Sequence, residues 1–124
     1  MTTDDRDPAE LPLIDREGLL RRVGGSEEVA REVYRNIAEG LPGHVDRCRQ
    51  AFRSGDLELL GRTAHTIKGS AATAGADRTA SFACRLHQSC REHPQDTALL
   101  ERALEDLSRN VEELLATIGG EEGS

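Results

Sequence analysis

The most restrictive feature of this sequence is the spacing of its apolar residues, which recur in alternating steps of three and four. Such steps place side chains on one stripe of an α-helix, whereas a half-buried β-strand requires alternate residues. The pattern is clearest in two segments, whose apolar positions are Leu57, Leu60, Ala64, Ile67, Ala71 and Ala74, and Leu100, Leu104, Leu107, Val111, Leu114 and Ile118. Stripes of this kind are typical of helices that pack along one another in a bundle.

Composition favours the same fold class. The chain of 124 residues contains one Tyr, two Phe and no Trp, and its apolar content is mostly Ala and Leu, accompanied by many Glu and Arg. These four residue types favour helices, and a sandwich or barrel needs more β-branched and aromatic side chains. We therefore predict an all-α protein.

Capping residues and glycines predict five helices. They are expected between the following boundary residues: Asp15 and Gly24, Ser26 and Gly55, Asp56 and Gly75, Asp77 and Pro94, and Asp96 and Gly119. In the second helix, Val29, Val33, Ile37 and Leu41 should face the core, and Pro42 should kink or break the helix. Long helices with short connections indicate an antiparallel four-helix bundle, here preceded by one short helix.

The ends of the chain differ from the bundle in composition. Residues 1–12 are polar and contain Pro8 and Pro12, so we expect a flexible acidic arm. Residues 119–124 are rich in Gly and Glu and are expected to form a disordered tail. The bundle should therefore cover residues 13–118.

Charge and cysteine content exclude several classes of protein. Sixteen basic and twenty-three acidic residues give a net charge of −7, which argues against a nucleic-acid binder. No apolar run approaches the ~18 residues of a membrane span, and the acidic N-terminus does not resemble a secretory signal. Three cysteines without disulfide-framework spacing favour reduced thiols. The expectation is a cytoplasmic monomer that binds neither nucleic acid nor membrane.

The third predicted helix carries the candidate site beside its apolar stripe. His65 follows the stripe residue Ala64 and should lie partly exposed at the edge of the bundle, with Gly61 and Gly69 one turn away on either side. Each glycine costs about 1 kcal/mol relative to Ala and removes a side chain that would shield the imidazole. Lys68, on the same face, can neutralise a phosphoryl group carried by His65. Glycines can also mark a close helix crossing, and a lone surface histidine is often only solvated.

The segment around His65 resembles a known family. Ala64-His65-Thr66-Ile67-Lys68-Gly69-Ser70-Ala71, followed by Gly75-Ala76, is similar to the A-H-x-L-K-G-S-A…G-A signature of histidine-containing phosphotransfer (HPt) domains. Residues 19–26 resemble the first helix and Gly-Gly turn of that family, and residues 51–56 resemble the segment before the histidine helix. The similarity extends over residues 13–117.

The resemblance implies a phosphocarrier with no kinase activity of its own. His65 would accept a phosphoryl group from a receiver-domain aspartate or a hybrid histidine kinase and pass it to a response regulator. Lys68 would be the charge partner of the phosphate, Gly69 would give access and Ser70 would support the site. No cofactor is implied for this chain, since the magnesium belongs to the partner receiver domain. A module that only docks a receiver, or that serves as a phosphate sink, is the alternative.

The fourth helix departs from the family pattern. Some HPt domains have a Gln or Glu there that reaches the acceptor imidazole, and by spacing that position is His87. A protonated His87 would repel a protonated His65 but assist a phosphorylated one. Arg91, one turn further on, can add positive charge. Thr79 replaces a large aliphatic residue of the family and is expected to loosen the core.

Two other classes of function were weighed. Cys84, His87, Cys90 and His93 are residue types that bind zinc. Residues six apart on a continuous helix point about 120° apart, so Cys84 and Cys90 do not readily meet at one ion, and buried thiols are the simpler interpretation. No glycine-rich phosphate loop, Ser-His-Asp order or pair of carboxylates indicates an enzyme.

Overall fold

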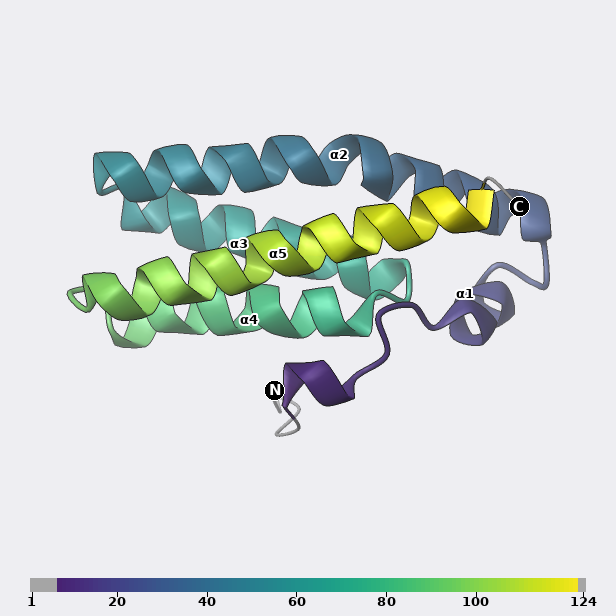
Figure 1. Cartoon of the computed structure of the whole chain (residues 1–124), viewed down its shortest axis with the longest axis horizontal. Coiled ribbons are helices and arrows are strands. Elements are labelled where there is room, and N and C mark those ends of the chain that lie inside the picture. The colour runs from purple at the N-terminus through teal and green to yellow at the C-terminus, as the bar shows by residue number, and fades with distance from the viewer. Residues whose placement is uncertain (1–6, 123–124) are drawn as a thin grey trace.

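A computed structural model describes residues 7–122, and these residues form helices without any strand. The elements are a 3-10 helix, η1 (Pro8–Glu10), and five α-helices: α1 (Arg16–Arg22), α2 (Glu27–Ser54), α3 (Leu57–Thr73), α4 (Asp77–Glu92) and α5 (Thr97–Glu122). Helices α2 to α5 run alternately up and down along one long axis, and the short α1 lies near one end of them (Figure 1). The predicted all-α fold is confirmed.

Local capping chemistry sets four of the α-helix starts, whereas α4 was expected to follow Asp77 but begins at Asp77, after Ala76, without a side-chain capping bond. Asp15, Ser26, Asp56 and Asp96 each precede a helix, and each side chain accepts a hydrogen bond from the backbone N–H three residues later, at 3.0–3.2 Å. Such a bond satisfies one of the backbone donors left unpaired at a helix start. Gly75 follows the end of α3 with a φ of 78°, a conformation that favours glycine.

Pro42 lies inside α2 without ending it, so of the predicted kink or break the break is absent. A proline within a helix has no N–H, and the carbonyl of the residue four before it, here Ala38, loses its helical hydrogen bond. Pro42 is exposed, on the side of α2 that faces away from the core. The surrounding water can therefore hydrogen-bond to the backbone groups that the proline leaves unpaired.

The core lies between the four long helices. All six predicted stripe residues of α5 are buried, and in α3 only Leu57 is half-buried. In α2 the buried stripe begins with Ala30 and Tyr34, whereas Val29 is 41% exposed and Val33 is half-buried. The predicted positions of α2 follow one another in steps of four residues. Each step lies about 40° further around the helix, so the predicted stripe moves away from the buried face.

Thr79 does not loosen the core. It is fully buried, and its hydroxyl donates a hydrogen bond to the side-chain oxygen of Asn110, which is also buried. The bond joins α4 to α5 and satisfies two polar groups that would be costly to bury alone. The position expected to be loosely packed therefore holds a buried polar pair.

The N-terminal segment differs from the predicted flexible arm. Pro8 and Leu11 are buried, and η1 packs against α4. Arg78 of α4 donates its backbone N–H to the Pro12 carbonyl at 3.1 Å and its Nε–H to the Leu11 carbonyl at 3.0 Å. Two buried apolar residues and two hydrogen bonds from Arg78 therefore fix this polar segment on the bundle.

The C-terminal boundary also lies further along than predicted. Helix α5 continues through Gly119 and Gly120 to Glu122, whereas the bundle was expected to end at residue 118. Neither glycine has a positive φ, so neither ends the helix in the way that Gly75 does. Residues 1–6 of the expected arm and 123–124 of the expected tail lie outside the described residues.

Candidate functional site

Helix α3 presents His65 at the edge of the bundle. The imidazole is exposed, while Ala64 before it and Ile67 after it are fully buried. Burial of these neighbours fixes the rotation of α3, so the direction in which His65 points is set by the core. Lys68 lies one turn further on the same face and is half-buried. The structure therefore places His65 and Lys68 one turn apart on one side of α3.

Gly69 opens the surface beside His65. It is exposed, and a Cβ atom at this position would have no neighbouring atom within 4 Å. The internal packing of the chain therefore does not require glycine here, although glycine costs about 1 kcal/mol in a helix relative to Ala. The missing side chain leaves room for an approaching molecule.

Gly61 has a different environment from Gly69, which corrects the role expected for it. It is buried, and a Cβ atom would lie 3.6 Å from the Cβ of Cys90 and 3.7 Å from Nδ1 of His87. These are ordinary packing distances to helix α4. Gly61 therefore belongs to the contact between α3 and α4 and does not open the surface to a partner.

His87 projects from α4 and lies beside His65. The centroids of the two imidazole rings are 5.3 Å apart, with an angle of 47° between the ring planes. Nδ1 of His87 is 2.9 Å from the carbonyl oxygen of Gly61, and since a carbonyl can only accept, Nδ1–H is the donor. The residue thus reaches the predicted place, but it is anchored to the backbone of α3 and not to the acceptor ring.

The two remaining predicted site residues are Ser70 on α3 and Arg91 on α4. Ser70 is half-buried, and its hydroxyl makes no hydrogen bond within the described part of the chain. Arg91 is exposed, one turn beyond His87 on α4. Neither side chain forms a hydrogen bond with His65 within residues 7–122, so any support they give depends on a bound phosphoryl group or partner.

Charge is distributed unevenly over the chain. The α3–α4 hairpin, residues 57–92, contains five basic and three acidic residues, whereas the other residues contain eleven basic and twenty acidic ones. The hairpin is therefore formally +2 and the remainder −9. No described carboxylate forms an ion pair with Arg62, Lys68 or Arg91. The prediction from the sequence used only the net charge and did not identify this uneven distribution, although the order of the charged residues shows it.

Comparison with protein families settles which family this is. The model of the Hpt domain family matches residues 32–118, well over half of the chain. The chain belongs to the Hpt domain family. An Hpt domain is a phosphotransfer module of two-component systems, a phosphocarrier and not a kinase, that interacts with receiver domains and histidine kinases in phosphorelays.

No curated protein and no solved structure gives a significant match to the chain. Within residues 7–122, none of the helices of this Hpt domain is long and apolar enough to cross a membrane.

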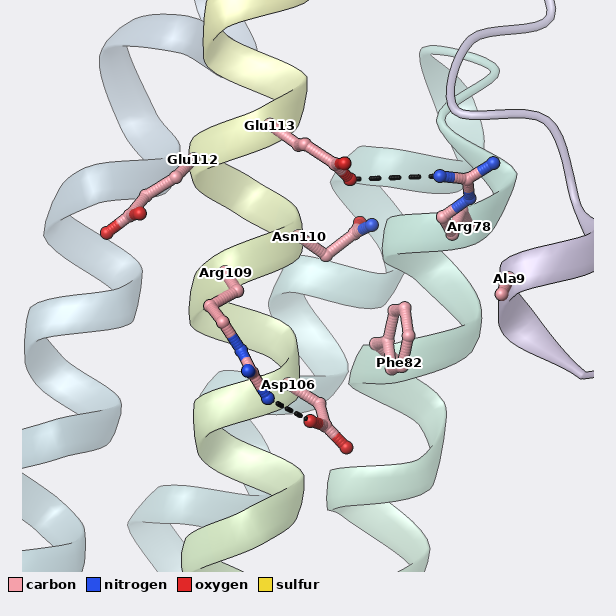
Figure 2. A pocket seen from close by; sticks show the side chains of 8 residues that line it. All are labelled: Ala9, Arg78, Phe82, Asp106, Arg109, Asn110, Glu112 and Glu113. Atoms are coloured by element: carbon pink, nitrogen blue, oxygen red, sulfur yellow. Dashed lines mark hydrogen bonds and ion pairs between the residues drawn. The ribbon is translucent and has the colours of Figure 1, made fainter.

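A groove of about 600 Å³ elsewhere on the Hpt domain lacks the features of an anion site. Figure 2 shows it between η1, α4 and α5, lined by none of the predicted site residues. Both of its arginines face carboxylates: Arg78 lies 3.7 Å from Glu113, and Arg109 lies 2.7 Å from Asp106. The two arginines of this groove are therefore already paired, whereas Arg62, Lys68 and Arg91 of the hairpin have no ion pair with a described carboxylate.

The cysteine and histidine residues that could supply zinc ligands do not come together in a metal site within residues 7–122. Cys84 and Cys90 are buried, and burial raises the pKa of the Cys90 thiol, which disfavours the thiolate that a metal requires. Burial, with the neighbouring Cys90 as a second cause, raises the pKa of Cys48 to about 12. His93 is exposed at the end of α4. Among the described residues, no group of three His, Cys, Asp or Glu side chains is placed to hold a metal ion.

Proposed function

We propose that this Hpt domain carries a phosphoryl group on His65, accepted from the aspartate of a phosphorylated receiver domain or a hybrid histidine kinase and passed to a response regulator. One observation carries the proposal: α3 presents His65 as an exposed imidazole beside its buried stripe, one turn from the half-buried Lys68 and from the open surface at Gly69. A nucleophile held this way needs no rearrangement of the chain to meet a partner.

The transfer step requires little chemistry from this chain. A ring nitrogen of His65 attacks the phosphorus of the aspartyl phosphate, the N–P bond forms as the bond to the carboxylate oxygen breaks, and the carboxylate leaves. Histidine side chains in proteins are largely neutral near pH 7, so a lone pair is available. The proposal assigns magnesium to the partner receiver domain and no cofactor to this chain, because phosphoryl transfer depends mainly on positioning and on neutralising charge.

The charge of the hairpin supports an acidic partner. A receiver domain presents carboxylates around its phosphorylated aspartate, and the +2 hairpin of this chain complements them, whereas the −9 of the remaining residues repels them. Lys68 then lies where the ammonium group can meet the phosphoryl oxygens on His65. The uneven charge favours approach by the face that carries the nucleophile.

Transfer of radiolabel from a receiver domain tests the proposal. A receiver domain is labelled with a ³²P-labelled small-molecule phosphodonor, freed of the donor and mixed with this protein. We expect label to move to this protein in an acid-labile form, as an N–P bond requires. Binding of the receiver in a titration without any transfer of label would contradict the proposal and favour the docking module.

Replacing Gly69 with Leu should separate transfer from stability. Because the position is open and helical, Gly69→Leu is expected to stabilise α3 by up to about 1 kcal/mol. The new side chain should obstruct the partner and slow transfer at least about tenfold, which corresponds to about 1.4 kcal/mol in the barrier. Stopped transfer reactions and urea unfolding measure the two effects.

Gly119→Leu is the matched control, because Gly119 is also an exposed helical glycine with nothing within 4 Å of its Cβ position, but it lies near the end of α5. This variant should transfer phosphate at the normal rate. Normal transfer by Gly69→Leu would show that the open surface is not the approach path.

A further inference from the structure

A second concave surface lies between α4 and α5, and we call it the α4–α5 hollow. It has a volume of about 380 Å³ and adjoins the groove of Figure 2, with which it shares Phe82 and Asp106. Residues of α4, of its C-cap and of the first half of α5 line it, and none of them is a predicted site residue. The hollow is therefore separate from the site around His65.

The α4–α5 hollow opens on the side of α4 that faces away from His65. Successive residues of an α-helix are about 100° apart, so Phe82, Arg85 and Ser89 lie about 140–160° around the axis of α4 from His87. His87 faces α3, where the centroid of its ring is 5.3 Å from that of His65. A molecule bound in the hollow would therefore leave the imidazole of His65 exposed.

Both helices contribute apolar side chains to the hollow. Phe82 of α4 and Leu99 and Ala103 of α5 are half-buried, and Phe82 and Ala103 also pack against the core. Figure 2 shows the ring of Phe82 in the space between the two helices. A rigid aromatic side chain that stays partly accessible in a concave surface is the kind of residue on which binding energy concentrates.

The edge of the hollow carries positive charge that no carboxylate of the chain neutralises. Arg85 of α4 and Arg102 of α5 are exposed and form no ion pair with a described residue. Of the two carboxylates that line the hollow, Asp106 is already paired with Arg109 at 2.7 Å, which leaves only Glu92. Two arginines therefore face one carboxylate, whereas the chain as a whole has a net charge of −7.

We propose that the α4–α5 hollow is a docking site for an acidic amphipathic helix of a partner protein. The apolar side chains of the hollow select an apolar stripe, and its unpaired arginines select carboxylates beside that stripe. The site would hold a partner on one side of the Hpt domain while His65 remains open to a receiver domain on the other. Binding in the hollow goes beyond the proposed phosphoryl transfer and does not depend on it.

The shape of the hollow fits a helix of about three turns. Phe82 and Glu92 are ten positions apart on α4, which corresponds to about 15 Å along its axis. A helix that lies between two others contacts them through residues in steps of three and four. The apolar residues of the partner would contact Phe82 and Leu99, and carboxylates on its flanks would reach Arg85 and Arg102.

Fluorescence anisotropy of a labelled peptide tests the proposal. The probe is a synthetic peptide of about 18 residues, long enough for a marginal helix in water, with Leu in steps of three and four, Glu on the flanks and Ala elsewhere. A matched peptide has Lys in place of every Glu. The net charge of −7 favours the Lys peptide, whereas the hollow favours the Glu peptide. We expect the full chain to bind the Glu peptide at least about tenfold more tightly, and less tightly as salt is added.

Two variants separate the apolar and the charged parts of the hollow. Leu99→Glu removes an apolar contact and places a carboxylate in the first turn of α5, where the helix dipole favours it, so the fold is kept. Arg102→Glu reverses an exposed charge. Each variant should bind the Glu peptide about tenfold more weakly, as expected for a residue that matters in an interface. The control Arg35→Glu makes the same charge change at an exposed position of α2 and should bind as the native protein does.

Several results would overturn the proposal. Tighter binding of the Lys peptide, or equal affinity of the three variants for the Glu peptide, would show that the hollow does not select an acidic helix. Displacement of the Glu peptide by a receiver domain would place the hollow within the receiver interface. A mass that doubles with concentration in the native protein but not in Leu99→Glu would assign the hollow to a second copy of the chain. Failure of the transfer assay would overturn the function of His65 and leave these results unchanged.

Discussion

His65→Gln is expected to reduce the uptake of acid-labile phosphate from a phosphorylated receiver domain to background. The amide nitrogen of glutamine has no lone pair available for attack on phosphorus, so the nucleophile is removed. The side chain at this position is exposed, and surface substitutions usually change stability by no more than about 0.5 kcal/mol. Label uptake, far-UV circular dichroism and thermal unfolding of the purified variant measure these effects.

Two other histidines of the chain provide matched controls. His44→Gln and His93→Gln remove imidazoles from α2 and from the C-cap of α4, and neither side chain forms a hydrogen bond with a described residue. Both variants should take up label at the native rate. Normal uptake by His65→Gln, or its loss in either control, would place the acceptor elsewhere and refute the assignment.

Helix starts could be predicted because capping is local chemistry. Asp15, Ser26 and Asp56 each make their hydrogen bond to a residue three positions away, so the sequence alone contains both partners. Two features of α2 depend on which of its sides faces the other three long helices. They are whether Pro42 ends the helix and which residues of its first turns are buried. That information lies in the packing of the bundle, and the sequence pattern near Val29 was compatible with two rotations.

The same distinction applies to the site. Gly61 and Gly69 are equivalent in local sequence, each one turn from His65, and the sequence predicts a single role for both. The structure separates them, because α4 covers Gly61 and leaves Gly69 open. The contact of His87 with the Gly61 carbonyl likewise joins residues on two helices. The resemblance to HPt domains supplied the place of His87 but not its hydrogen-bond partner.

Gly75→Ala is expected to lower the free energy of unfolding by about 3 kcal/mol. The φ of Gly75 is 78°, and a non-glycine residue in this conformation costs about 1–2 kcal/mol. An added Cβ would also lie 2.7 Å from the backbone oxygen of Asp15, which cannot move freely because the N–H of Asp15 donates to the Gly75 carbonyl at 2.7 Å. Crowding of this kind typically costs about 1–3 kcal/mol. Urea unfolding measures the loss.

Gly24→Ala isolates the backbone contribution. Gly24 has a φ of 68°, is exposed, and has nothing within 4 Å of its Cβ position, so its loss should be confined to about 1–2 kcal/mol of conformational strain. Equal losses in the two variants, at unchanged dependence on urea, would show that the contact with Asp15 relaxes and that Gly75 is required only for its φ.

The Gly75 variant also separates stability from chemistry. Gly75 follows His65 by ten positions of helix and turn, which corresponds to about 15 Å along a helix axis. The strain that the new Cβ imposes falls on Asp15 and the segment that joins η1 to α1. This segment contacts the Gly75 end of α3, about 15 Å from the imidazole. At temperatures where the variant remains folded, it should therefore accept phosphate at close to the native rate. A folded Gly75→Ala protein that failed to do so would show that the connection between α3 and α4 controls the position of His65.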